Sequence, residues 1–348
     1  MPKHHLLAAL TLLSGSSGTA LAQADTPPPT CPPPAVADTV DMQPVSGSNL
    51  MTVPVAINGT PKQFLLNIGR TPDMISDAAS SSLRLAQTNM TTGLDGFSGL
   101  NTPSEFRAVM FDVKSGIKPT DYQGRVQAGS FTIGAATVQN VVFLIANDRD
   151  LGKAKPYDGL LTTAMFSKFD LNLDFGGKKL TFLAPTACQN PVYWPHQVVA
   201  VVPMTMVDHK ITVPVTIDGR QIDAIIDTSS DHTVMRRGLA EQKFGLKADT
   251  ADMTPAGDLR DGTGQRVYQH TFPQFAFEGV IASNVPALIQ TNSMVHKMDK
   301  TPTLGSKATF AADPSDRVPD LALGMDVLHQ LHIYIAFDQN KIFITPAG

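Results

Sequence analysis

Cysteine is scarce in this chain of 348 residues, which contains only Cys31 and Cys188. The two are 157 positions apart (188 minus 31), so no close pair exists of the kind that thioredoxin-like redox sites require. In an exported protein, two distant cysteines favour a single disulfide bond, and two unpaired thiols are the alternative.

Charged residues are also few, at 17% of the chain against roughly 25% in an average globular domain. The net charge is -4, and no run of lysine or arginine is longer than a pair. The sequence therefore lacks the basic patch that binding to nucleic acid or to an anionic membrane requires. Glycine and proline, with 26 residues each, are plentiful and predict a turn-rich, mostly β protein.

Long apolar runs are absent, because no stretch reaches the roughly 18 residues of a membrane-spanning helix. The short apolar run of residues 6–13 follows Lys3 and precedes Ala20-Leu21-Ala22, a small-x-small cleavage pattern. Residues 1–22 are therefore predicted to be a signal peptide, and the protein to be exported, either periplasmic or secreted. The residues before Cys31 do not form a lipid-attachment pattern, so no lipid anchor is expected.

Two irregular stretches divide the rest of the chain. Residues 23–48 are rich in proline and small polar residues, which predicts an extended tether. Residues 187–203 predict a linker, and the chain's one tryptophan, Trp194, is expected to pack there at a domain seam. The two lobes are thus predicted to be residues 49–186 and 204–348.

An internal repeat relates the two lobes. Residues 53–59 (VPVAING) recur as residues 213–219 (VPVTIDG), 160 positions later. Each copy ends in Asn-Gly or Asp-Gly, the strongest short signal for a β-hairpin. After each turn a return strand leads, without a gap in the alignment, to the triplets Asn67-Ile68-Gly69 and Asp227-Thr228-Ser229.

The two halves also end alike. Residues 159–162 (GLLT) and 321–324 (LALG) are short apolar runs, predicted to be buried strands that enter a short helix. Residues 171–175 and 333–337 then predict equivalent closing strands, each followed by a tight turn and a last strand. Two tandem copies of one β-rich fold are the simplest explanation.

This order of elements resembles the retropepsin-like and pepsin-like aspartic peptidases. The resemblance implies an all-β fold of two tandem retropepsin-like β-barrel lobes, related by a pseudo-twofold axis, with a cleft between them for an extended peptide. It makes Asp227 the counterpart of the family's catalytic aspartate and Thr228 that of its hydroxyl residue. Flap hairpins are expected at residues 260–265 and, with weaker turn chemistry, at residues 94–99.

Three residues depart from the family pattern of Asp-Thr-Gly or Asp-Ser-Gly. Asn67 stands where the second carboxylate of the dyad belongs, and an amide cannot act as a titrating acid or base. Ile68 replaces the hydroxyl residue that joins the two triplet loops, and Ser229 replaces the glycine of the tight turn. The candidate catalytic set is therefore Asp227, Thr228, Ser229 and Asn67, with an incomplete dyad.

Other sources of a second acid are conceivable. Asp73 and Asp77 are the nearest carboxylates along the chain, but they follow Asn67 by six and ten positions. Pairing of the second lobes of two chains would bring two copies of Asp227 together, although the attached first lobe competes for that surface. We expect a monomer with internal pseudo-symmetry.

Three functional hypotheses follow. The first is an aspartic-type endopeptidase, an enzyme that acts on extended peptides with Asp227 as general base. The second is an inactive pseudopeptidase in which Asp227 and Asn67 form a hydrogen-bonded pair that anchors a peptide or unfolded segment by strand addition. The third is an envelope scaffold with a closed cleft.

No cofactor or metal is predicted. His329 and His332 are three positions apart beside Asp326, a spacing that can bind metal on a helix, but they fall where a short helix passes into the last strands. Structural roles are therefore favoured for both histidines. His232, near Asp227, is interpreted as a residue of a surface turn.

Overall fold

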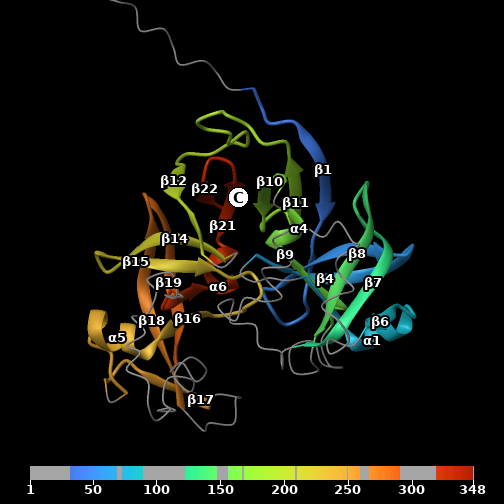
Figure 1. The fold of residues 1–348 in the computed structure, drawn as a ribbon. Coiled ribbons are helices and arrows are strands. Elements are labelled where there is room, and N and C mark those ends of the chain that lie inside the picture. The colour runs from blue at the N-terminus through green and yellow to red at the C-terminus, as the bar shows by residue number, and fades with distance from the viewer. Residues whose placement is uncertain are drawn as a thin grey trace, which may run out of the picture.

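The computed structural model describes residues 32–68, 73–88, 122–146, 156–166, 168–207, 210–248, 250–258, 266–290 and 319–347. Within them the protein is nearly all β, with two lobes side by side and a sheet that spans both (Figure 1). No helix of this part of the chain has the length and apolar character needed to cross a membrane. The predicted signal peptide lies outside the described residues.

The first lobe is an eight-stranded sheet with the order β2-β3-β4-β9-β5-β8-β7-β6. Because β3 also pairs with β7, the six strands from β3 to β7 in this order form a closed ring. The elements are β2 (Gln43–Pro44), β3 (Met51–Ile57), β4 (Thr60–Asn67), β5 (Met74–Ser76), α1 (Asp77–Ser82), β6 (Ala86–Thr88), β7 (Tyr122–Ile133), β8 (Ala136–Ala146), β9 (Gly159–Thr162) and α4 (Thr163–Phe166).

The second lobe repeats this arrangement, with the order β13-β14-β15-β20-β16-β19-β18-β17. Pairing of β14 with β18 closes the equivalent ring of six strands. The elements are β13 (Thr205–Val207), β14 (Lys210–Ile217), β15 (Arg220–Ile226), β16 (Thr233–Arg236), α5 (Arg237–Phe244), β17 (Thr254–Asp258), β18 (Arg266–Phe277), β19 (Val280–Gln290), β20 (Leu321–Leu323) and α6 (Met325–Leu328).

A six-stranded sheet joins the lobes, with the order β1-β11-β10-β21-β22-β12. Its strands are β1 (Val36–Asp41), β10 (Asp170–Asp174), β11 (Lys179–Leu183), β12 (Ala200–Pro203), β21 (Leu331–Ala336) and β22 (Lys341–Pro346). The antiparallel pair β10–β21 connects strands of the first lobe to strands of the second. We call this the inter-lobe sheet; in Figure 1 it lies above and between the lobes.

Two segments differ from the sequence prediction. Residues 36–44, assigned to the tether, form β1 and β2, and β1 pairs with β11. Residues 200–203, assigned to the linker, form β12, which pairs with β22. In both places a short strand gains backbone hydrogen bonds at a sheet edge, and Val40, Ala200 and Val202 are buried there.

The hairpin and segment predictions are confirmed. Asn58 and Gly59 in the first lobe, and Asp218 and Gly219 in the second, all have positive φ, as a type I′ turn requires. The two apolar segments are β9 and β20, and they lead into α4 and α6. One apolar core runs through both lobes, and in the first lobe Phe64, Phe131 and Phe143 pack together with ring centroids 5.6–5.9 Å apart.

Cys188 is disulfide-bonded, in agreement with the single-bridge expectation. The chain's other cysteine, Cys31, lies just outside the described residues.

Candidate functional site

The two triplets start at equivalent strand ends. In the first lobe β4 and β9 are parallel neighbours, with Asn67 opposite Thr162. In the second lobe β15 and β20 are parallel neighbours, and the amide of Asp227 donates to the carbonyl oxygen of Leu323 at 2.9 Å. The repeat in the sequence is therefore also a repeat in the position of the two triplets.

Thr228 connects the two triplet loops. Its Oγ1 donates to the carbonyl oxygen of Leu66 at 2.8 Å and accepts from the amide of Ile68 at 2.9 Å. The side chain is buried, with 1% of its surface exposed, so water does not compete for these bonds. We call residues 66–68 and 227–229 the loop junction, since this one hydroxyl joins the backbones of the two lobes there.

The connection is one-sided. Ile68 occupies the position equivalent to Thr228 but has no hydroxyl, so its side chain cannot return a hydrogen bond to the second lobe. Ile68 is completely buried and contributes apolar packing instead.

Asp227 is partly exposed, and its Oδ1 is held by Ser229. The amide of Ser229 donates to it at 3.0 Å and the hydroxyl at 2.6 Å. Ser229, which stands where the family pattern has glycine, thus supplies a donor to the carboxylate that glycine would lack. An acceptor that retains an unbonded oxygen near solvent is suited to binding a donor from a ligand.

Asn67 is completely buried, and neither its Oδ1 nor its Nδ2 has a hydrogen-bond partner. The hydrogen bond between Asn67 and Asp227, which the binding hypothesis expects, is therefore not formed. Buried amide atoms without partners are costly, at about 1–3 kcal/mol each. Such an arrangement is unusual in a core.

Asp73 is a buried carboxylate close to the first triplet. Its Oδ1 accepts a hydrogen bond from the amide of Thr162 at 2.7 Å. Burial raises the pKa of Asp73 to about 6, and the Thr162 amide partly offsets this. In the second lobe the same position is Thr233, whose Oγ1 accepts from the amide of Gly324 at 3.0 Å. Asp73 thus has a structural role, as the hydrogen-bond acceptor for the amide at the end of β9.

Asp326 in α6 is the corresponding buried carboxylate of the second lobe. It accepts hydrogen bonds from the amide of Thr233 at 2.9 and 3.0 Å and from its hydroxyl at 2.6 Å. The pKa of Asp326 is raised, mainly because the carboxyl group is buried. The sequence prediction considered Asp326 only as a neighbour of two histidines. The polar Thr233 at the start of β16 is the signal that could have indicated this contact.

A second hydrogen-bonded contact between the lobes involves Asp231, four residues after Asp227. Its Oδ1 accepts from the hydroxyl of Ser48 at 2.6 Å and from the amide of Asn49 at 2.9 Å. The sequence prediction missed this contact because Ser48 belongs to a segment interpreted as tether. It is a second connection between the lobes, beside the loop junction.

The remaining candidates have structural contacts or lie outside the described residues. Asp77 is the first residue of α1. His329 Nδ1 bonds to the Met325 carbonyl oxygen, and His332 bonds to Asn172. No group of three metal-ligating side chains occurs among the residues that the structure describes. The predicted flaps at 94–99 and 260–265 lie outside them, although β17 and β18, which flank the latter, pair with Asp258 opposite Arg266.

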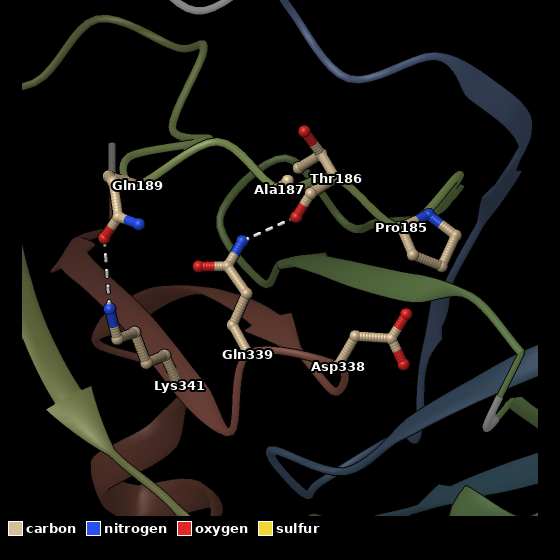
Figure 2. A pocket seen from close by; sticks show the side chains of 7 residues that line it. All are labelled: Pro185, Thr186, Ala187, Gln189, Asp338, Gln339 and Lys341. Atoms are coloured by element: carbon tan, nitrogen blue, oxygen red, sulfur yellow. Dashed lines mark hydrogen bonds between the residues drawn. The ribbon is translucent and has the colours of Figure 1, made fainter.

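A pocket of about 460 Å³ lies at one end of the inter-lobe sheet, between the segment that follows β11 and the turn between β21 and β22 (Figure 2). Gln339 points across it, and its Nε2 donates to the carbonyl oxygens of Thr186 at 2.7 Å and Cys188 at 2.9 Å. Its lining contains none of Asn67, Asp227, Thr228 or Ser229. The pocket is therefore separate from the loop junction.

Comparisons with known proteins give a family match in the second lobe. Residues 213–327, about a third of the chain, match the family model described as aspartyl protease. A search of curated proteins gives no significant match.

Three solved structures with low sequence identity are similar. A retropepsin-like aspartic protease from Rickettsia conorii is 12% identical, covering 44% of this chain and 96% of its own, with a TM-score of 0.31. Basic 7S globulin from soybean is 11% identical, covering 90% of this chain and 95% of its own, with a TM-score of 0.46. Conglutin gamma, a basic 7S globulin from lupine seeds, is 10% identical, with the same coverage and a TM-score of 0.47.

The family match lies in the second lobe, and the first lobe repeats the strand order of the second. The second lobe is therefore similar in sequence to aspartyl proteases, and the chain has two lobes of the same strand order in tandem.

Proposed function

We propose that this protein is exported and binds an extended polypeptide segment at the loop junction without hydrolysing it. In this proposal Asp227 is the polar group that faces the ligand, and Thr228 holds the two lobes in register. Ser229 orients the Asp227 carboxylate, and Asn67 lies at the position of the missing acid. The protein is then a pseudopeptidase that keeps the fold of an aspartic peptidase but not its dyad.

The observation that carries the proposal is the pair of hydrogen bonds at Thr228 Oγ1, which donates to the Leu66 carbonyl oxygen and accepts from the Ile68 amide. They place the backbone on either side of Asn67 against the residue that follows Asp227. The counterpart of the Asp227 carboxylate at the loop junction is therefore an amide.

The chemistry of hydrolysis argues against cleavage. An aspartic dyad shares one proton, so that one carboxylate activates water while the other donates to the scissile carbonyl. Asn67 can donate and accept hydrogen bonds but cannot exchange a proton in this way. Loss of general acid–base assistance lowers a rate by roughly 10²- to 10⁴-fold. The nearest other acid, Asp73, is already bonded to the Thr162 amide.

The first test separates binding from cleavage. The chain from residue 23 onward is incubated with a fluorescence-quenched peptide library between pH 3 and 7, and binding of the same peptides is measured by fluorescence anisotropy. We expect saturable binding and no products. Asp227→Asn should weaken binding by roughly 10-fold or more, because hydrogen bonds to charged groups contribute about 1.5–3 kcal/mol.

The matched control is Asp223→Asn, which removes an exposed carboxylate from the same strand, β15, and should leave binding unchanged. Product formation that Asp227→Asn abolishes would show that the chain is a peptidase and overturn the proposal. Absence of binding to any peptide would leave the closed-scaffold hypothesis.

The second test restores the dyad. The double variant Asn67→Asp with Ile68→Thr should cleave the peptides that the unmodified chain only binds, with Asn67→Asp alone as the intermediate control. A double variant that is folded and binds peptide but forms no product would contradict the assignment of position 67 as the site of the missing acid.

A further inference from the structure

A cluster of buried polar side chains lies away from the loop junction, where the two lobes meet in the inter-lobe sheet. On the pair β10–β21, Asp174 is opposite His332 and Asn172 is opposite Tyr334. Asn172, His332 and Tyr334 are all buried. The linker residues Val192, Trp194 and Val199 pack against this part of the sheet. Neither the proposed peptide site nor the family match accounts for these residues.

His332 lies between the sheet and the linker. Its Nε2 is 2.6 Å from Asn172 Oδ1, and Asn172 Nδ2 donates to the hydroxyl of Tyr193 at 2.7 Å. Because the amide nitrogen of Asn172 is a donor to Tyr193, its Oδ1 is the acceptor, and His332 therefore carries its proton on Nε2. The imidazole ring stacks on Trp194, with centroids 3.8 Å apart and an angle of 11° between the planes.

The same two linker residues make further contacts with the sheet. Trp194 Nε1 donates to Thr345 Oγ1 at 3.0 Å. The ring of Tyr193 meets that of Trp194 edge to face at 5.5 Å. His332, Asn172, Tyr193 and Trp194, which we call the His332 cluster, thus attach the linker to strands of both lobes.

The charged and titratable groups around His332 come from each neighbouring element. Asp174 on β10 lies opposite and favours the imidazolium, but burial opposes it more strongly and lowers the pKa of His332. On β11, Lys179 is opposite Asp174 and bonds to Asp41 at 2.6 Å. From the linker, the phenol oxygen of Tyr193 accepts a hydrogen bond from Asn172, which lies between Tyr193 and His332.

The next residue along this face, Tyr334, donates its hydroxyl to Asp170 at 2.9 Å. Asp170 therefore accepts a hydrogen bond from Tyr334 and does not serve as the partner of His332. A second proton on His332 would place a positive charge between an aromatic ring and a buried sheet face, with Asp174 as the nearest counter-charge. Asp174 and the face of Trp194 stabilise that charge in place, but burial outweighs Asp174. Hydration of the ring would lift the cost of burial, and it requires the stacked Trp194 to leave.

We propose that the His332 cluster is a pH-sensitive attachment of the inter-lobe linker, which holds Tyr193 and Trp194 on the sheet while His332 is neutral and releases them when it is protonated. The two lobes stay joined by the β10–β21 pairing, so the release changes the linker and not the fold.

Trp194 gives a direct measurement, because it is the only tryptophan in the chain. The emission of the full chain is recorded from pH 8 to pH 4 together with far-ultraviolet circular dichroism. We expect a red shift with a midpoint below 6.5, the ordinary pKa of histidine, while the dichroism stays constant. His332→Phe retains a stacking ring without a titrating group and should abolish the shift. His329→Gln, three positions earlier in the chain, is the matched control and should retain it.

Four results would overturn the proposal. They are unchanged emission down to pH 4, loss of intensity without a red shift, a shift that persists in His332→Phe, and a shift that coincides with loss of dichroism. Loss of intensity alone would mean that the charged ring stays stacked on Trp194. If His332→Phe does not fold, the titration of the His332 ring by proton NMR in the unmodified chain replaces it, and a midpoint different from that of the emission would contradict the proposal.

Discussion

In each lobe a backbone amide at the end of β9 or β20 donates to a side-chain oxygen, but the side chain that accepts differs between the lobes. In the first lobe the amide of Thr162 donates to the carboxylate of Asp73, and in the second the amide of Gly324 donates to the hydroxyl of Thr233. The second lobe then adds Asp326, which accepts from Thr233, whereas the equivalent position in α4 (326 minus 162) is Ala164. Each lobe therefore has one buried carboxylate at this connection, but on a different segment.

The difference shows which requirements the duplicated fold imposes. An acceptor must face the amide at the end of β9 or β20, and either a hydroxyl or a carboxyl oxygen satisfies it. At the loop junction a hydroxyl is needed in only one lobe, because Thr228 alone joins both backbones and Ile68 has no hydroxyl. The two lobes share their strand order, while only the second has a carboxylate and a hydroxyl side chain at the first two positions of the triplet.

The largest effect is expected at Gly324, where the second lobe leaves no room for a Cβ. A Cβ at this position would lie 2.3 Å from the carbonyl carbon of His232 and 2.7 Å from the amide nitrogen of Thr233. Backbone atoms cannot move aside cheaply, so Gly324→Ala should lower the free energy of unfolding by roughly 5 kcal/mol. Its counterpart, Thr162, already carries a Cβ. Urea denaturation measures the effect.

The control for that prediction is Gly238→Ala in α5, where the added Cβ meets no atom within 4 Å. It should be neutral or stabilising by up to about 1 kcal/mol, because alanine favours helix. A Gly324→Ala protein as stable as this control would show that β16 and α6 adjust easily, and that the space at Gly324 is not what separates the lobes.

The next effect in size is expected at Thr228. Thr228→Val keeps the shape of the side chain but leaves the Leu66 carbonyl and the Ile68 amide without their partner. Two buried unpaired groups at about 2 kcal/mol each predict a loss of about 4 kcal/mol in the free energy of unfolding. Thr228→Ser, which retains the hydroxyl, should recover most of it. Equal stability of the Val and Ser variants would mean that the lobes do not depend on this connection.

A smaller effect, with a distinctive pH dependence, is expected at Asp73. Its pKa rises from 3.8 to about 6 on folding, so the folded state holds the proton more tightly than the unfolded state. Stability from this group is complete below pH 3.8 and is lost as the pH rises through 6. A shift of about 2 pK units corresponds to about 3 kcal/mol.

Asp73→Asn should remove this dependence, which denaturation at pH 4 and pH 7 would measure. The control is Asp77→Asn, which alters a partly exposed acid at the start of α1 and should leave the dependence intact. A dependence that survives in Asp73→Asn would assign it to another buried acid, such as Asp170 or Asp326.

Much of the fold could be predicted from local signals. The Asn-Gly and Asp-Gly turns require positive φ, and the apolar segments before α4 and α6 can only be buried strands. The strands β1 and β12 could not be predicted, because their stability comes from pairing with β11 and β22, more than a hundred residues away in the chain. The domain boundaries and the export signal stay predictions.

The candidate site divides in the same way. The sequence placed Asn67 and Asp227 in register through the repeat, and it identified Thr228 as the hydroxyl residue. It did not indicate that Asn67 lacks a hydrogen-bond partner, that Ser229 holds Asp227, or that Asp231 contacts Ser48. These are contacts between side chains and distant backbone, which no spacing along the chain encodes.

By itself, the sequence determined that this protein is a duplicated β fold with one acid where a dyad needs two, because hairpin turns and strand patterns are local and an asparagine cannot titrate. Only the tertiary structure decided that one threonine hydroxyl joins the lobes and that His332 stacks on the linker. Those contacts depend on how two barrels close and meet, which is set by packing across the whole chain.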